Sequence, residues 1–579
     1  MNTVIDAFGL ILAPALPLLM IVLWCVPGFR PRIACWAPWA ALPALLLALG
    51  GETGALARLD WLLFGTVLGL NELNRVFLAF TAMLWLGAGF YARGYMAGDS
   101  RGEPFRVLWL ATMSGNFGLI LALDVASFYA SFALMTFAAY GLVIHAHSAE
   151  ALRAGRVYLV MAIVGEALIL TGLLLAAGGS AAPILPMLAE LPDAIAASAR
   201  RDLIIACLFL GFGVKAGVPL LHMWLPLAHP VAPIPASAVL SGAMIKAGLL
   251  GWLTTLPLGV ASLPWWSAVI MIAGLIAAFG GALVGVHQRT PKTVLAYSSI
   301  SQMGLITVGV GAGLQAPALW PALAPAVALY ALHHGLAKGA LFLGVGIARH
   351  SGGHIGRPWL WIALALPGLS LAGLMSSGIA AKLTLKQTLA AAETPAWWDH
   401  LPWLMGLAAI GTAALVLRYL WLLRGQDQGD RASRSVWLGW AMLLVAGSLS
   451  VFALPAIGIE AEWIASMADL VGLVWPVLIG LALAELARKH LRPLPIPSGD
   501  VLAWFIAAGQ LAGRSLRRLP AGARRVWTRI LRSGHGIRRR AAHRNGYGTH
   551  AERFWRRESA MVFVALLVAV TLASLAFAS

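Results

Sequence analysis

Apolar stretches of about 20 residues, separated by short polar turns, recur along almost the whole chain. A helix of that length crosses a hydrocarbon layer about 30 Å thick, so each stretch is a candidate membrane span. The hydrophobic stretch at 55–70 is ambiguous and is assigned no element. The pattern predicts sixteen spans, near residues 4–26, 33–50, 74–95, 105–123, 125–146, 157–177, 202–221, 234–256, 264–286, 293–313, 321–347, 359–381, 400–423, 436–456, 466–487 and 559–578.

These spans predict an all-α polytopic membrane protein, because the apolar runs are continuous and do not alternate as the strands of a membrane β-barrel do. The first twenty residues lack a basic n-region and a small-residue cleavage signal, so we interpret them as a retained span. The loops are short. We therefore expect no sizeable soluble domain that could hold a flavin, a nucleotide or an iron–sulfur cluster.

Composition agrees with this fold class: 60% of the 579 residues are hydrophobic and 11% are charged. The net charge of +18 is concentrated near the C-terminus, where residues 514–557 contain fourteen arginines and one acidic residue. Because this stretch lies between two apolar runs, we expect it to face the cytoplasm and bind anionic lipid headgroups rather than nucleic acid. The segment 488–558 begins apolar and becomes basic, which is typical of an interfacial amphipathic helix, and 559–578 is expected to anchor the chain again.

The three cysteines, Cys25, Cys35 and Cys207, have neither the spacing of a metal site nor that of a disulfide framework. We therefore expect no metal, no cofactor and no catalytic redox centre in this chain.

The lysines occupy unusual positions. The chain has seven lysines and thirty-four arginines, and most arginines flank spans or lie in the basic tail. Lys215, Lys246, Lys338, Lys382 and Lys386 instead fall inside apolar segments or at interruptions in them. A buried lysine can release its proton, whereas arginine stays charged. The alternative is that a lysine near a span end extends to the headgroups, and it stays open for Lys292 and Lys386.

Two lysines lie beside predicted helix breaks. Gly213, Gly217 and Pro219 surround Lys215, and a Pro- and Gly-rich stretch at 367–378 precedes Lys382. Unwound backbone at membrane depth persists only where protein or trapped water satisfies its polar groups. Two separated broken spans, each with a lysine, are the pattern of transporters built from inverted repeats. Ordinary kinks are the alternative interpretation.

Histidines and acids complete the candidate set. His222 follows Lys215 by two helical turns, and His334 can share a helix face with Lys338. Histidine titrates near neutrality and can pass protons through water. Glu166 lies mid-span and is interpreted as a partner of Lys215 rather than a neutral core acid. Further candidates are His333, Asp124 and Glu72, while His229 is interpreted as structural.

Four motifs carry a family resemblance: GFGVKAGVPLLHMWLPLAHPVAPIPASAVLSGAMIKAG, TPKTVLAYSSISQMGLITVGVG, ALHHGLAKGALFLGVG and SLAGLMSSGIAAK. They resemble the proton-conducting antiporter-like subunits of respiratory complex I, Mrp-type cation/proton antiporters and membrane-bound hydrogenases, over roughly residues 70–400. The AHPVAPIPAS turn is most similar to the hydrogenase-4 and formate-hydrogenlyase membrane subunit. The basic tail and final span resemble those of the longest antiporter-like subunit of complex I.

The resemblance implies fourteen core helices in two inverted five-helix repeats with broken seventh and twelfth helices. It implies N-terminal helices at 1–123, repeats at 105–256 and 264–423, and C-terminal helices at 436–487. Lys215, Lys246, Lys338 and Lys382 match the lysines of helices seven, eight, eleven and twelve, and His222 and His334 match the connecting histidines. The sequence departs from the family at Ala133, where a fifth-helix glutamate is usual, and we expect Glu166 to replace it.

We therefore expect a proton-translocating subunit of a larger complex in a bacterial inner membrane. Other membrane and peripheral subunits are its expected partners. The driving module is expected to be a redox assembly of the hydrogenase or complex I type. The alternatives are an Mrp-type antiporter, a proton inlet for a large partner that takes up inorganic carbon, and a purely structural scaffold.

Overall fold

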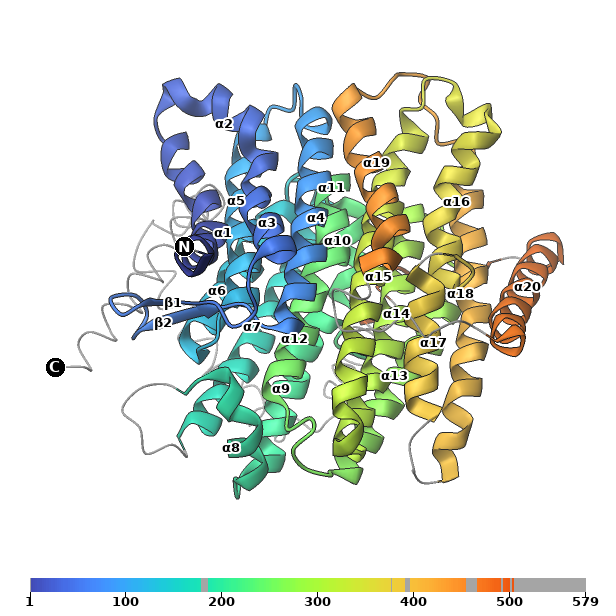
Figure 1. The fold of residues 1–579 in the computed structure, drawn as a ribbon. Helices are drawn as coiled ribbons and strands as arrows, with labels where there is room; N and C mark the ends of the chain where they lie inside the picture. Colours follow the sequence, from blue (N-terminus) through green and yellow to red (C-terminus); the bar gives the residue numbers. More distant parts are fainter. Residues whose placement is uncertain are drawn as a thin grey trace, which may run out of the picture. The chain divides into compact units, whose positions relative to one another are not determined.

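The computed structural model describes residues 2–178, 186–375, 377–390, 396–453, 466–490, 493–499 and 502–503. The chain divides into two units, residues 1–498 and 499–579, and the first unit is a bundle of helices (Figure 1). The Arg-rich stretch 514–557, the final span 559–578 and most of the amphipathic segment expected at 488–558 lie outside the described residues.

The first half of the bundle begins with the long span α1 and a second helical span, Pro27–Gly50, that contains α2 and α3. Several of its helices start at a capping side chain: Asn71 and Asn74 form a capping box before α4, and Asp124 and Ser148 cap α6 and α7. In chain order the helices are α1 (Asn2–Trp24), α2 (Arg30–Trp36), α3 (Leu42–Gly50), α4 (Glu72–Tyr95), α5 (Gly102–Leu121), α6 (Val125–Val143), α7 (Ala149–Ala177), α8 (Leu191–Ala197), α9 (Arg201–Ala216), α10 (Trp224–Val231), α11 (Ile234–Val239) and α12 (Ile245–Thr255).

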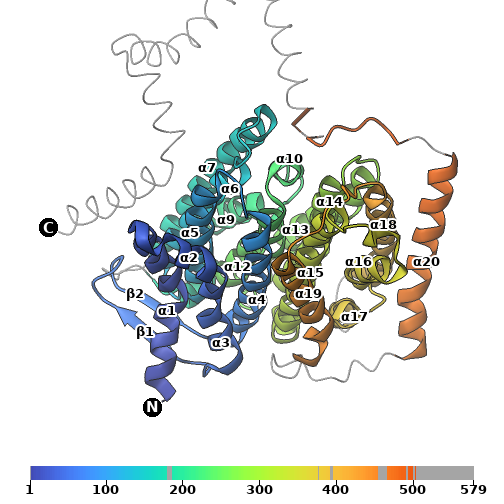
Figure 2. The same ribbon diagram turned by 90° about the horizontal axis from the view of Figure 1, so that it is seen from above.

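The second half repeats the alternation of long apolar helices and short turns. Close crossings depend on glycine here: a Cβ on Gly304 of α14 would lie 2.4 Å from the carbonyl oxygen of Gly274 on α13. The helices are α13 (Pro264–Gly285), α14 (Pro291–Gln315), α15 (Trp320–Arg349), α16 (Pro358–Ala372), α17 (Ser377–Ala390), α18 (Leu401–Leu423), α19 (Arg434–Leu449) and α20 (Met467–His490). Figure 2 shows the two halves side by side, with α20 against α18 at one edge.

The structure confirms an all-helical polytopic membrane protein. In its described part, thirteen helical segments are long and apolar enough to cross a membrane. α5 and the α9–α10 pair pack among them. Together these elements account for the fifteen spans that the sequence predicts between residues 4 and 487.

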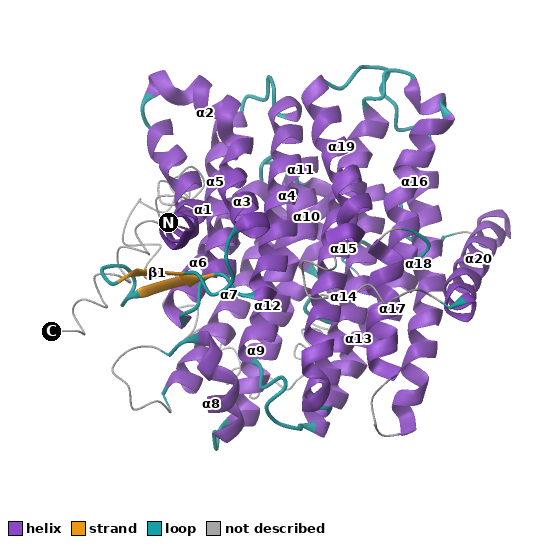
Figure 3. Ribbon diagram, viewed as in Figure 1, coloured by secondary structure: helices purple, strands orange, loops and turns teal. Residues whose placement is uncertain are grey.

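The ambiguous stretch at 55–70 is a β-hairpin (Figure 3), formed by β1 (Leu56–Leu59) and β2 (Thr66–Gly69) in antiparallel register. Its turn uses three residues with positive φ, Leu63, Phe64 and Gly65. The hairpin connects α3 to α4 on the same side of the bundle as the α5–α6 turn, because Leu68 pairs with Ala122. This hydrophobic stretch is too short to form a spanning helix, and it forms two short strands instead.

Two spans are broken near their middle. Between α9 and α10 the backbone takes positive φ at Gly217 (87°) and Leu220 (70°), and between α16 and α17 it does so at Gly373 (100°). The breaks lie five spans apart, so the two broken spans run in opposite directions, as Figure 1 shows. Inverted repeats require this relationship, and the repeat boundaries 105–256 and 264–423 stay predictions.

The alternation of spans defines two faces of the unit. We call the face with the turns at 25–29, 96–101, 144–148, 286–290, 350–357 and 424–433 the α2 face. The opposite face, with the hairpin, α8 and the turns at 256–263 and 316–319, is the α8 face (Figure 1).

Candidate functional site

Five lysines are buried in the described part of the bundle. Four of them lie on different spans, Lys215 on α9, Lys246 on α12, Lys338 on α15 and Lys382 on α17, and none of these four is more than 6% exposed. We call these four residues the lysine row. An ammonium group inside a membrane protein costs several kcal/mol unless it is paired or solvated, so the contacts of each amine are informative.

Lys215 lies in the last turn of α9, which ends at Ala216 and has Gly217 as its C-cap. A cation at this position is favoured by the partial negative charge of the helix C-terminus. Its Nζ donates to the hydroxyl of Tyr158 at 3.1 Å, and that hydroxyl donates to the carbonyl oxygen of Thr136 at 2.8 Å. The rings of Phe132, Tyr158 and Trp224 surround the amine, with centroids 5.9, 5.2 and 5.7 Å from Nζ. These three rings form an aromatic cage around Lys215.

Glu166 of α7 lines the same small cavity as Lys215. The cavity has a volume of about 10 Å³, which is room for about one water. No direct ion pair joins the two side chains, and the Thr136 hydroxyl lies near the carboxylate outside standard hydrogen-bond geometry. The structure thus brings together the two residues that the sequence analysis paired, with space for a bridging water.

Polar groups of Ser241, Ser299 and Leu295 lie between the two middle lysines. Lys246 Nζ donates to the carbonyl oxygen of Ser241 (2.8 Å), within the π-helical segment Leu240–Met244. The Ser241 hydroxyl contacts the Ser299 hydroxyl at 2.7 Å, and Ser299 bonds to the carbonyl oxygen of Leu295 at 3.0 Å. Lys338 Nζ donates to that same oxygen at 3.0 Å. Lys246 bonds the backbone oxygen of Ser241, whereas Ser299 contacts its hydroxyl, so the two amines lie at opposite ends of a set of polar groups that is not one unbroken chain of hydrogen bonds.

His333 and His334 lie on α15 just before Lys338, and both are buried. Nδ1 of His333 is 3.0 Å from the hydroxyl of Ser377, the first residue of α17. Neither ring nitrogen of His334 has a hydrogen-bond partner within the described part of the chain. Buried imidazole nitrogens are normally bonded, so His334 has capacity for internal water.

Lys382 ends the row at the second break. Its Nζ donates to the carbonyl oxygen of Ala372, the last residue of α16, at 2.8 Å. Lys382 and Lys386 line one small cavity with Tyr330, whose hydroxyl donates to Gln302 at 3.0 Å.

The remaining candidates occupy other surroundings. His222 is buried in the first break, and its ring lies 6.4 Å from that of Tyr297. Both carboxylate oxygens of Asp124 accept backbone N–H groups, from Ser127 (2.7 Å) and Val67 (2.8 Å), so this acid holds the hairpin and the start of α6. Glu72 is exposed at the first turn of α4. The structure does not bring Glu72 into the lysine row, and a role of Asp124 in it stays a prediction.

For two residues, Lys292 and His229, the structure shows burial and contacts that the sequence did not indicate. Lys292, which could have extended to the headgroups, is buried, and its Nζ donates to the carbonyl oxygen of Ala232 at 2.5 Å. His229 is fully buried and stacked on Phe342 at 4.6 Å, and both Lys292 and Lys338 lie within electrostatic reach of it. His229 lies in a Pro-rich turn, where the regular helical spacing that would place a residue on a buried face is interrupted. The sequence therefore did not indicate its burial.

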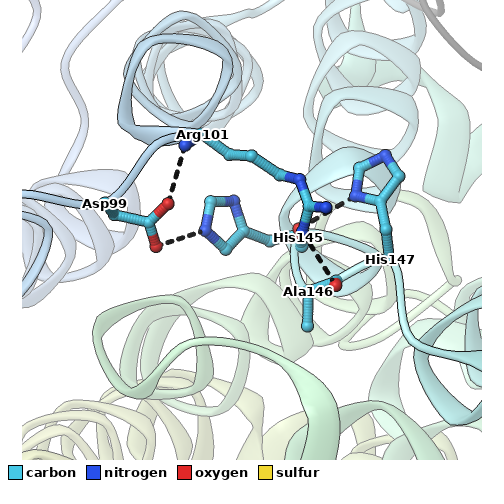
Figure 4. Close-up of polar contacts among 5 residues, drawn as sticks. All are labelled: Asp99, Arg101, His145, Ala146 and His147. Carbon is cyan, nitrogen blue, oxygen red and sulfur yellow. Dashed lines mark hydrogen bonds and ion pairs between the residues drawn. The ribbon is translucent and has the colours of Figure 1, made fainter.

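A polar cluster lies outside the membrane spans, in the turns of the α2 face (Figure 4). Nε2 of His145 lies 3.0 Å from an Asp99 oxygen, and the backbone N–H of Arg101 donates to the other oxygen at 2.7 Å. The guanidinium of Arg101 donates to the carbonyl oxygen of Ala146 at 2.9 Å, which fixes the turn after α6. The hydrogen bond from His145, followed by that from Arg101, holds the pKa of Asp99 below its usual range. Among the described residues, no three histidine, cysteine or acidic side chains are placed to hold a metal ion.

Comparison with known proteins gives the same fold. The profile of the NADH:quinone oxidoreductase/Mrp antiporter transmembrane family matches residues 122–357. Hydrogenase-4 component B of Escherichia coli K12 is 30% identical over 289 residues, 48% of this chain and 43% of the relative. Formate hydrogenlyase subunit 3 of the same organism is 40% identical over 151 residues, 25% of each chain. The chain thus spans less than half the length of these relatives.

Among solved structures, the Mrp complex from Dietzia sp. DQ12-45-1b contains a chain that matches with a TM-score of 0.72 at 22% identity. The match covers 91% of this chain and 62% of that one. At this identity the likeness establishes the fold. The two relatives and the solved structure named here are each described as a component or subunit of a larger assembly.

Proposed function

We propose that this chain, whose residues 122–357 match the NADH:quinone oxidoreductase/Mrp antiporter transmembrane family, is a proton-conducting subunit of a larger membrane complex. The observation that carries the proposal is the lysine row: four buried amines on four spans, each bonded to a carbonyl or hydroxyl oxygen. A structural scaffold gains nothing from such amines, because apolar side chains would pack there at lower cost.

Protons pass along the row by local exchange. Lys215 and Glu166 share one cavity, and protonation of either changes the electrostatic energy of the other. The hydroxyls of Ser241 and Ser299 lie between Lys246 and Lys338, and His334 supplies two further nitrogens beside Lys338. Lys382 receives or releases the proton at the second break. His222 lies in the first break, and His333 contacts Ser377 at the start of α17, beside the second break.

The driving module we propose is a redox assembly of the hydrogenase type. Sequence similarity to hydrogenase-4 component B and to formate hydrogenlyase subunit 3 supports this choice. An Mrp-type antiporter shares the fold and is the second outcome that the experiment below distinguishes. The relatives reported above name no carbon-uptake system, so the comparisons do not support that alternative.

The distribution of arginine supports an orientation with the α2 face in the cytoplasm. By the positive-inside rule, short cytoplasmic loops carry the excess of basic residues. Arginines on the α8 face are Arg58, Arg75, Arg200 and Arg201. Those on the α2 face are Arg30, Arg32, Arg93, Arg101, Arg153, Arg156, Arg289, Arg349, Arg357, Arg424, Arg431 and Arg434. We propose the inner membrane of a bacterium as the location.

The test is purification of the intact complex through a tag on this chain, followed by identification of its subunits and reconstitution in vesicles. Iron–sulfur and nickel subunits support a hydrogenase-type module, whereas small antiporter subunits support an Mrp-type assembly.

Lys338→Met should lower proton translocation driven by the complex at least tenfold, as expected for loss of a proton-transfer group. Lys489→Met, at the C-terminal end of α20, is the matched control and should translocate normally. Wild-type translocation by Lys338→Met would reject the proposal.

A further inference from the structure

A cavity of about 230 Å³ lies among α15, α16 and α19, outside the lysine row. Most of its wall is apolar and includes Ala337, Leu366, Pro367 and Leu443. An apolar cavity of about 150 Å³ is enough to bind benzene and stays dry without it. The space is therefore large enough for a substituted six-membered ring.

One polar group of the wall is left for a ligand. His333 lines the cavity and is 1% exposed, and its Nε2 has no hydrogen-bond partner among the described residues. The other nitrogen, Nδ1, contacts the Ser377 hydroxyl at 3.0 Å, and that hydroxyl donates to the carbonyl oxygen of Gly447 at 3.2 Å. A serine hydroxyl has one hydrogen, so Ser377 accepts from Nδ1–H. Neutral His333 consequently presents Nε2 to the cavity as an acceptor.

The other polar side chains of the wall already have partners. The Ser370 hydroxyl donates to the carbonyl oxygen of Met375 at 2.8 Å, and Ser448 also has an interaction partner. A buried water needs about two to four polar partners, and this cavity offers it one strong acceptor. Water alone therefore fits the site poorly, and so does a lipid acyl chain, which has no donor for Nε2.

We propose that this cavity is a binding site for a small, mainly apolar molecule with a single O–H donor, of the alkylphenol class. Its hydroxyl donates to Nε2 of His333, and its ring and alkyl group fill the apolar part. Met375, at the cavity wall, is 38% exposed, so a molecule dissolved in the bilayer reaches the site from the side. One consequence rests on the proposed function: an occupant that engages Nε2 of His333 blocks proton exchange at the second break.

The test compares 4-propylphenol with 4-propylanisole, a probe of similar shape whose oxygen carries no hydrogen. Binding to the purified complex is measured by the rise in unfolding temperature, since a ligand that binds only the folded state stabilises it. The phenol should bind about tenfold more tightly than the anisole, which is the factor expected for one net hydrogen bond. Equal affinity for the two probes would overturn the proposal.

Two variants locate the site. Leu444→Trp, on α19, fills the cavity from one wall and should abolish the shift caused by the phenol. Leu449→Trp, on the same helix but 54% exposed, is the matched control and should bind normally. If Leu444→Trp fails to fold, Ala337→Leu fills the cavity from α15. Binding that survives a folded cavity-filling variant would place the phenol elsewhere and overturn the proposal.

Proton translocation is measured in the same preparations. Inhibition by the phenol in wild-type protein and in Leu449→Trp, but not in Leu444→Trp, supports both the site and its connection to the lysine row. Donor-dependent binding without inhibition supports the site and counts against a role of His333 in proton transfer. Failure of the proposed function is recognised separately, by wild-type translocation in Lys338→Met.

Discussion

Lys382 donates a hydrogen bond of 2.8 Å to the carbonyl oxygen of Ala372 across the break between α16 and α17. Ala372 is the last residue of α16, and the final carbonyls of a helix carry partial negative charge. Lys215 occupies the last turn of α9, ahead of the first break. In both broken spans the end of the first half-helix therefore stabilises a buried ammonium group, and the break itself positions the charge.

Gly373→Ala should disturb the second break. The residue has φ of 100°, and an added Cβ would lie 2.8 Å from Cδ of Lys382. A left-handed conformation costs a residue with a Cβ about 1–2 kcal/mol, so we expect a lower unfolding temperature and reduced proton translocation. Gly280→Ala on α13, where a Cβ meets nothing within 4 Å, is the control and should leave both unchanged. Wild-type stability of Gly373→Ala would show that this backbone conformation is not required.

Ser299→Ala should disturb the polar region between Lys246 and Lys338. The serine links the Ser241 hydroxyl to the carbonyl oxygen that Lys338 bonds. Loss of this hydroxyl removes a polar group from the region between the two amines and should slow proton translocation about tenfold, while the fold persists because only one hydroxyl is removed. Ser301→Ala removes an equally buried hydroxyl, bonded to Ala278, and should translocate normally. Equal rates in the two variants would exclude the Ser299 hydroxyl from the pathway.

The sequence predicts the spans and the burial of the lysine row for a simple reason. A lysine inside an apolar run of about 20 residues must lie in the membrane interior if the run is a span, as for Lys246 and Lys338. Glycine and proline beside Lys215 and Lys382 likewise indicate the breaks that the structure confirms. These features depend on local sequence alone.

Other features depend on packing between spans and could not be predicted. The aromatic cage takes Phe132, Tyr158 and Trp224 from three helices, and no spacing along the chain relates them. The contact between Ser241 and Ser299 joins residues of the π-helical segment Leu240–Met244 and of α14 that are 58 positions apart. The cavity beside His333 exists only where α16 and α19 meet α15. Local pattern identifies the titratable groups, and tertiary contacts decide what each one bonds.

Glu166→Gln should lower proton translocation because it removes the carboxylate that shares a cavity with Lys215. We expect a loss of about tenfold or more, the usual effect of removing a group that exchanges protons. Glu150→Gln changes an acid in the first turn of the same helix and should have no effect. Ala133→Glu, which restores a carboxylate on α6, should recover part of the activity of Glu166→Gln. Wild-type activity of Glu166→Gln would show that Lys215 depends on the aromatic cage alone.

Asp99→Asn should loosen the turn after α6 in a pH-dependent way. The pKa of Asp99 is lowered in the folded protein, first by the hydrogen bond from His145 and then by that from the backbone of Arg101. A lowered pKa means that ionised Asp99 stabilises the fold at pH values above its unfolded pKa, about 3.9. That stabilisation is lost as the pH falls from there through the lower pKa of the folded state.

Hydrogen exchange of the amides at 144–148 measures this effect as the ratio of rates in Asp99→Asn and wild-type protein. The ratio should exceed one near neutral pH and approach one under acid conditions, because protonated Asp99 resembles asparagine. Asp430→Asn is the matched control, since Asp430 pairs with His350 at 2.9 Å in a different turn of the α2 face. It should leave the ratio at 144–148 equal to one throughout. A ratio in Asp99→Asn that does not change with pH would mean that the geometry of the pair, and not the charge of Asp99, holds the turn.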